Sequence, residues 1–278
     1  MNDEIATRVK AFYEELPFNY SGNPEETCKD VSANPIVGYP DLDRILKSGQ
    51  IASFLEVGCG VGWLCNSVAL HYDIPIEAMD LTEKAIERAK AVADRLDIGS
   101  KTRFQCANLY DFNPGKTFDM VTSIGVLPAV ADPKMAFMHI SRFVASKKYI
   151  YLGFYHHYGR KVFREMFDNI LEKQGEKAAW SHYKAIHPLG DETLMRSWFR
   201  DQVVHPHEVW HTLEEVVDWL NESDFRLVST SINKFREFNS IAELVDMEKD
   251  YEALSHRANY VEKRYFPGFF TILARSEK

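Results

Sequence analysis

The sequence predicts an α/β fold built on a doubly wound, mostly parallel sheet. Two observations predict it. Short apolar runs alternate with helical patterns from residue 50 to residue 155, and this alternation is typical of parallel strands joined by helices. The first apolar run ends in a glycine-rich turn, Gly58-Cys-Gly-Val-Gly62, that leads directly into a helical pattern. Glycines let the backbone approach a ligand closely, and the N–H groups that begin a helix point toward it, so we expect a ligand site at this turn.

The expected elements follow in order along the chain. Residues 1–16 have apolar positions at helical spacing, and Pro17 and Pro24 predict a loop to Tyr39, before a short helix from Asp41. The expected strands span residues 51–57, 74–80, 103–107, 118–123, 148–154, 225–231 and 267–274. The expected helices of the sheet region span residues 61–71, 82–99, 132–144 and 212–220.

Two stretches depart from the alternation and predict helical insertions. Residues 156–211 hold a strongly amphipathic segment and a part rich in His, Trp and Arg, which is too long for a connecting loop. Residues 239–264 are helical in pattern and charged. The predicted organisation is therefore an N-terminal helical segment or lid (1–49), a ligand-binding core (50–155), a cap (156–211) and the remainder of the core (212–278).

Composition excludes several classes of function. The net charge is −8 and no basic run occurs, so a nucleic-acid partner is not expected. The four cysteines show no paired spacing, which indicates free thiols in a reducing compartment. The acidic N-terminus and the absence of a long apolar run predict no signal peptide and no membrane span. We therefore expect a cytoplasmic protein that is a monomer or a homodimer.

The spacing of the glycine turn separates two kinds of nucleotide-like ligand. A dinucleotide site has G-x-G-x-x-G, but here the spacing is G-x-G-x-G and Trp63 stands where the third glycine should be. Glu56, two residues before the turn, would face a pyrophosphate unfavourably but suits a positive amino or sulfonium group. The stretch resembles motif I of the class I S-adenosylmethionine (SAM) methyltransferases, whose pattern is close to E-x-G-x-G-x-G. The resemblance implies a Rossmann-like methyltransferase fold of seven strands, with an antiparallel last strand.

The ends of the next strands add candidate cofactor-binding residues. Asp80 ends the second strand, where an acid can accept hydrogen bonds from ribose hydroxyls and where the family holds the ribose of SAM. Asn108 ends the third strand at the position of the family's usual Asp, which touches the adenine amino group. A charge that serves the following helix is the alternative for Asp80, and a simple turn residue is the alternative for Asn108. With SAM as cofactor and S-adenosylhomocysteine (SAH) as product, the expected cofactor-binding residues are Glu56, Gly58, Cys59, Gly60, Gly62, Asp80, Leu81, Asn108, Leu109 and Ile124.

The cap and the N-terminal segment supply candidate acceptor-binding residues. One of His205, His207 and His211 is the candidate base, since an imidazole can take a proton near neutral pH, although a structural histidine beside the helix start is the alternative for each. The expected acceptor-binding residues are Tyr13, Tyr20, Tyr155, Arg160, Trp198, Arg200 and Glu208. A core position is the alternative for Tyr13, because it lies on the apolar face of its helix. The arginines could pair with an anionic acceptor, but solvent exposure is the alternative for each.

His207-Glu-Val-Trp-His211 fits the zinc-protease signature H-E-x-x-H. That chemistry requires both histidines on one face of a helix. Thr212 and Glu215 form a capping-box pattern, which predicts that the helix begins after His211. No metal is therefore expected.

These observations predict a SAM-dependent methyltransferase that transfers a methyl group to an O or N atom of a small-molecule acceptor. The alternatives are a SAM-binding protein with other chemistry or no turnover, and, more remotely, an H-E-x-x-H metal hydrolase.

Overall fold

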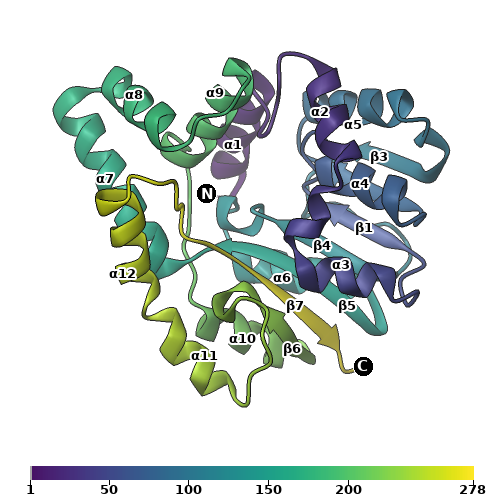
Figure 1. Cartoon of the computed structure of the whole chain (residues 1–278). Helices are drawn as coiled ribbons and strands as arrows, with labels where there is room; N and C mark the ends of the chain where they lie inside the picture. Colours follow the sequence, from purple (N-terminus) through teal and green to yellow (C-terminus); the bar gives the residue numbers. More distant parts are fainter. Residues whose placement is uncertain (1) are drawn as a thin grey trace.

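The computed structural model describes residues 2–278, and side chains from residue 4 onward. Its centre is one seven-stranded sheet in the order β3-β2-β1-β4-β5-β7-β6 (Figure 1). The strands are β1 (Phe54–Val57), β2 (Ile76–Asp80), β3 (Thr102–Cys106), β4 (Phe118–Ile124), β5 (Val144–Tyr155), β6 (Phe225–Thr230) and β7 (Phe269–Ser276). The first five strands pair in parallel, whereas β7 runs antiparallel to both β5 and β6. The predicted fold class is confirmed.

Helices cover both faces of the sheet. They are α1 (Asn2–Glu15), α2 (Pro24–Ser32), α3 (Pro40–Lys47), α4 (Trp63–His71), α5 (Glu83–Arg95), α6 (Pro133–Ile140) and α10 (Leu213–Glu222) in the sheet region, α7 (His157–Gln174), α8 (Glu176–Ile186) and α9 (Glu192–Val203) in the first insertion, and α11 (Ile241–Glu248) and α12 (Tyr251–His256) in the second. Short 3-10 turns are η1 (Pro35–Gly38), η2 (Gly99–Lys101), η3 (Leu127–Ala129), η4 (Ser141–Phe143) and η5 (Ser231–Asn233), and η6 (Arg257–Val261) is a π-helix. No described helix has the length and apolar character that crossing a membrane requires.

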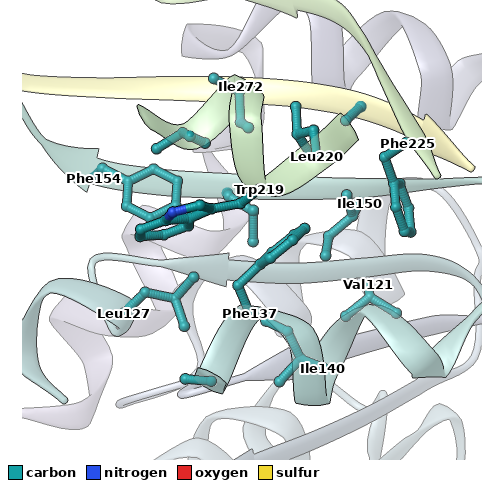
Figure 2. Packing of buried hydrophobic residues seen from close by; sticks show 14 of the residues in the cluster. Val121, Leu127, Phe137, Ile140, Ile150, Phe154, Trp219, Leu220, Phe225 and Ile272 are labelled. Carbon is teal, nitrogen blue, oxygen red and sulfur yellow. The ribbon is translucent and has the colours of Figure 1, made fainter. Parts of the chain in front are cut away.

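The two faces have separate hydrophobic cores. On one face, α3 and α4 pack apolar residues such as Leu46 and Val68 against the sheet. On the other, α6 and α10 cover it, and Phe137 and Trp219 lie with ring centroids 6.2 Å apart. Figure 2 shows these two rings packed among other apolar side chains of this core, including Phe154 and Ile150 of β5. This double cover explains why the strands read as continuous apolar runs in the sequence.

The main departure from the predicted elements is α2, which lies inside the expected loop of residues 17–39. Pro24 begins this helix instead of excluding it, because the first helical position needs no N–H donor. The Glu25 N–H donates to the Asn23 side chain (3.0 Å), which caps the helix. The first strand also begins at Phe54 and not at residue 51. The predicted free thiols are confirmed, since all four cysteines are unpaired.

The first insertion extends the molecule beyond the sheet. Its helices α7, α8 and α9 have their own apolar cluster, which includes Phe163, Tyr183 and Phe199. Helix α9 returns to lie beside α1 (Figure 1), and the Arg200 side chain donates to the Phe12 carbonyl (3.1 Å). Segments almost two hundred residues apart therefore meet above the carboxyl ends of the parallel strands.

Candidate functional site

A cavity of about 720 Å³ lies where the strand order reverses between β1 and β4. Open α/β sheets bind ligands at this point, outside the carboxyl ends of the strands. The glycine turn after β1 and the ends of β2 and β4 form its floor, and residues of α1 and α9 form its roof. Its lining is mainly apolar, with a few polar groups, as in many small-molecule sites.

The glycine turn brings the backbone to the cavity wall. Gly58 has φ +78°, and a Cβ atom there would lie 2.2 Å from Cγ2 of Val126, so no larger residue fits without movement. Gly60 has φ +51°, and the nearest atom to an added Cβ is the Phe18 carbonyl oxygen at 4.0 Å. The main chain at Gly60 therefore faces open space in the cavity, whereas Gly62 packs against α5 and does not line it.

Glu56 is a buried carboxyl group in the cavity floor. The Cys65 N–H in the first turn of α4 donates to its Oε2 (3.0 Å). Burial raises the pKa of Glu56 to about 8, and the nearby charge of Asp80 acts in the same direction. Because the carboxylate is costly here without a counter-charge, a cationic group beside it would favour its ionised form.

Asp80 joins the glycine turn to the start of α5. Its Oδ2 accepts from the Gly60 N–H (2.8 Å), and its Oδ1 accepts from the Thr82 N–H and hydroxyl (3.0 Å each). Burial raises the pKa of this carboxyl group above its usual value. Asp80 lines the cavity, so it both faces the site and supports the start of α5. A role in ligand binding and a role as a charge that serves the following helix are therefore compatible.

Other expected cofactor-binding residues also lie on the cavity wall. Asn108 and Leu109 follow β3, and the Asn108 Oδ1 accepts from the Tyr110 N–H (3.0 Å), which makes it a turn residue at the edge of the cavity. Cys59, Leu81 and Ile124 line the same space.

A network of buried and half-buried polar groups forms the opposite wall. Tyr13 of α1 donates to Oδ1 of Asp201 in α9 (2.5 Å), and Tyr155 at the end of β5 donates to its Oδ2 (3.0 Å). Gln202 Nε2 donates to the Tyr155 hydroxyl oxygen and to Asp201 Oδ2 (2.6 Å each). Burial, and then the charge of Asp201, raises the pKa of Tyr13 well above its usual value. All four side chains line the cavity.

Arg160 lies behind this wall and not on it. Its side chain is fully buried and is paired with Glu208 through Nε–Oε1 (2.7 Å) and Nη2–Oε2 (2.5 Å). Its Nη1 donates to Gln202 Oε1 (2.9 Å), and its guanidinium lies 3.9 Å from the Tyr155 ring centroid. Arg160 was expected to meet an anionic acceptor, but its donors bind protein groups, and its place indicates that it holds the wall in position.

Residues 55–152, from β1 through most of β5, match the family model described as a methyltransferase domain. This segment of the chain is thus similar to a methyltransferase domain. An uncharacterized protein of a Synechococcus strain is 24% identical over 273 residues, covering 83% of this chain and 61% of that protein. Ajmaline N-methyltransferase of Rauvolfia serpentina is 30% identical over 95 residues, covering 34% of this chain and 33% of that enzyme. The matches thus span less than two thirds of either relative.

Solved structures of low sequence identity share the fold. Magnesium protoporphyrin IX methyltransferase of Synechocystis, solved with bound SAM, has 12% identity and a TM-score of 0.52, with 98% of this chain and 97% of that chain covered. A Rickettsia typhi protein named PKMT2, in complex with SAH, has 13% identity and a TM-score of 0.55, with 82% of this chain and 49% of that chain covered. These likenesses show that the chain shares the Rossmann-like fold of these structures.

The remaining expected acceptor residues differ in their position relative to the cavity. Trp198 of α9 lines it, and its Nε1 donates to Asn19 Oδ1 (2.9 Å). Tyr20 lies outside it, with the Arg88 guanidinium 3.9 Å from its ring centroid. Arg200 is also outside, where it pairs with Glu15 (2.8 Å).

The three candidate histidines lie in the irregular segment between α9 and α10. His207 Nε2 contacts the Val130 carbonyl (3.1 Å), and His211 Nδ1 contacts Glu215 (3.0 Å). Helix α10 begins at Leu213 with Thr212 as its cap, as predicted, so H-E-x-x-H does not lie on a helix. Within the described part of the chain, no group of three His, Cys, Asp or Glu side chains could hold a metal ion. The geometry that a zinc hydrolase needs is not formed at this motif.

His205 and His207 border a small void beside the main cavity. This void, about 10 Å³ in volume, is also lined by Asp201 and Glu208, and it is about the size of one water molecule. The His205 Nδ1 accepts from the His207 N–H (3.2 Å), which leaves its proton on Nε2. Burial lowers the pKa of His205, so its ring is neutral at neutral pH and stands one layer behind the cavity wall.

Sequence reasoning missed several aromatic residues of the site. Tyr39, Tyr265 and Phe269 line the cavity, but they belong to loops or to a strand start, where periodicity carries no signal. Asp201 could have been identified as a candidate site residue from the sequence, because it is a charged residue on the apolar face of α9, between Phe199 and Val203. A charged side chain is seldom buried unless it is paired, so a carboxylate at such a position is informative.

Proposed function

We propose that this protein is a SAM-dependent methyltransferase that methylates an O or N atom of a small-molecule acceptor. One observation carries the proposal: the cavity at the carboxyl ends of the strands has two carboxyl groups in its floor, the buried Glu56 and the half-buried Asp80. SAM carries an ammonium and a sulfonium group, and both suit this floor. An acidic floor would disfavour the pyrophosphate of a dinucleotide.

The residues present fit the cofactor. The Gly60 backbone leaves open space where a side chain would stand, so the ligand can approach the main chain. Glu56 would face the amino group, and Leu109 would lie against the adenine beside Asn108. A carboxylate offers about four acceptor positions. Protein donors use three of these positions on Asp80, so its Oδ2 retains one for a ribose hydroxyl.

SAM supplies an activated methyl group, and the protein supplies position and environment. Methyl transfer is an in-line displacement, in which holding the acceptor atom opposite the leaving sulfur provides most of the rate. The roof formed by α1 and α9 would keep water out, and the mainly apolar lining suits the body of an organic acceptor. Tyr13, Tyr155 and Asp201 would contact its polar group.

The relatives support a small acceptor. Ajmaline N-methyltransferase is named for a small molecule, and so is the magnesium protoporphyrin IX methyltransferase of similar fold. A cavity of about 720 Å³ lies within the range of small-molecule sites.

Ligand binding tests the proposal directly. A ligand that binds only the folded state raises the melting temperature, so we expect SAM to stabilise the protein and NAD not to do so. The variant Asp80→Ala should weaken SAM binding at least several-fold in calorimetry, because it removes an acceptor and frees the glycine turn. Incubation with SAM labelled in the methyl group and a metabolite panel then tests turnover. Stabilisation by NAD alone, or unchanged SAM affinity in Asp80→Ala, would refute the assignment.

A further inference from the structure

The charge that lines the cavity is of one sign. Asp30, Asp80 and Asp201 contribute to its wall, together with Glu56, whose raised pKa lets it keep its proton at neutral pH until a cation lies beside it. None of its described lining residues is Lys, Arg or His. A low-dielectric cavity focuses the field of such charges. The cavity is therefore unfavourable for an acceptor that carries a carboxylate or a phosphate.

The cations nearest the roof do not compensate for this charge. Arg160 is paired with Glu208 behind Tyr155, and Arg200 is paired with Glu15 on the outer side of α9. The His205 ring behind Asp201 is neutral, since burial lowers its pKa. The arginines expected to bind an anionic acceptor are thus engaged elsewhere.

Asp201 is the carboxylate of the acceptor wall. Its side chain is buried, and its hydrogen-bond donors are the hydroxyls of Tyr13 and Tyr155 and the amide of Gln202. Among the described residues it forms no ion pair. Uncharged donors offset only part of the cost of burying a charge, so a cation from the ligand would complete this site.

The surrounding side chains favour the same kind of ligand. Phe18, Trp198, Tyr265 and Phe269 line the cavity with Asp201. Phe18 and Trp198 lie with ring centroids 4.8 Å apart, and Phe269 lies 5.5 Å from Tyr155. Aromatic faces attract cations and also bury apolar groups, which suits an organic amine.

We propose that the methyl acceptor is an amine with an apolar or aromatic body, and that Asp201 is the catalytic residue that binds its nitrogen. This inference rests on the proposed function and names the substrate class of that site. The amine binds as an ammonium ion between Asp201 and the aromatic wall, and the other acidic residues exclude anionic analogues.

The step balances with the groups present. The ammonium gives one proton to an Asp201 oxygen, which frees the nitrogen lone pair. That pair forms the N–C bond as the S–C bond breaks and its electrons pass to sulfur, giving SAH and an N-methylammonium product. The positive charge moves from sulfur to nitrogen, and Asp201 returns its proton to solvent as the product leaves.

A matched ligand series tests the assignment without requiring turnover. The protein is first saturated with SAH, so that a probe amine cannot occupy the place near Glu56. Binding of phenethylamine, phenethyl alcohol and phenylacetate is then compared by thermal shift and calorimetry. We expect phenethylamine to bind about tenfold more tightly than phenylacetate, because a charge-assisted hydrogen bond is gained. Equal or tighter binding of phenylacetate or phenethyl alcohol, or no measurable binding of phenethylamine, would overturn the proposal.

Two variants locate the effect. Asp201→Asn should abolish the preference for the amine and retain SAH binding, which shows that the protein still folds. Asp246→Asn, at an exposed carboxylate of α11 whose side chain is 78% exposed, should keep the preference. If Asp201→Asn still binds SAH and still prefers phenethylamine, Asp201 is not the group that recognises the amine. A wild-type protein that binds no SAM or SAH would instead remove the proposed function itself.

Discussion

Replacement of Glu56 by Gln should change how stability depends on pH. Burial raises the pKa of this carboxyl group from the usual 4.5 to about 8. The folded state therefore keeps a proton that the unfolded chain has already lost at neutral pH. The stability that this proton provides is therefore complete below the pKa of Glu56 in the unfolded chain, and it is lost as pH rises toward the pKa in the folded state. Glutamine resembles the protonated form and has no such dependence.

The size of the effect follows from the same two pKa values. Each pH unit between them changes the free energy of unfolding by about 1.4 kcal/mol. From about pH 6 to about pH 7.5, wild-type protein without ligand should lose about 2 kcal/mol relative to Glu56→Gln. The Gln amide oxygen can still accept from the Cys65 N–H, as Oε2 of Glu56 does at 3.0 Å.

Urea unfolding of both proteins at several pH values measures this difference. All other titrating groups are common to the two proteins, so their contributions cancel in the difference. Saturation with SAM should reduce it, because the positive groups of the ligand favour the carboxylate. If the two stability curves run parallel between about pH 6 and about pH 7.5, the carboxyl group does not titrate in this range and the reasoning is refuted.

Two further predictions concern the packing that supports the site. Gly62→Ala should destabilise the protein by about 1–3 kcal/mol more than Gly115→Ala. Both positions have positive φ. At Gly62 an added Cβ would lie 2.8 Å from the side-chain carbon of Ala89 in α5, whereas at Gly115 it would meet nothing within 4 Å. Equal melting temperatures of the two variants would contradict the steric argument. Glu208→Gln should cost about 3–5 kcal/mol, because it leaves the Arg160 charge buried without its partner. The control is Glu176→Gln, which removes an ion pair with Arg196 whose side chains are 63% and 42% exposed. It should change the free energy of unfolding in urea by less than about 1 kcal/mol. An equal loss of stability in both variants would show that the buried pair has no special role.

The sheet and its ligand edge were predictable because their signals are local. The alternation of apolar runs and helical patterns gives the strands, and Gly58 to Gly62 identify the turn after β1. The same reasoning placed Asp80 at the end of the next strand. The prediction of a loop over residues 17–39 was wrong at α2. It treated Pro24 as a residue that excludes a helix, whereas Asn23 and Pro24 together begin one.

The acceptor wall could not be predicted in the same way because its contacts are distant in the sequence. Tyr13 and Asp201 are 188 positions apart, and Tyr155 and Asp201 are 46 apart. No spacing rule connects these residues, and the arrangement depends on how the first insertion folds back over the sheet. The charged residues most visible in the sequence, Arg160 and Arg200, bind other protein groups.

The contrast between Arg160 and Asp201 shows how burial assigns roles at this site. Both side chains are buried and charged, but Arg160 has a carboxylate partner in Glu208, and Asp201 has only uncharged donors. A paired charge can hold a wall together without a ligand, whereas an unpaired one is stabilised further when a cation binds. Because Asp201 faces the cavity and Arg160 lies behind Tyr155, the site gains more from a positive acceptor than from a negative one. This inference needs side-chain positions, so the sequence alone favoured the opposite charge.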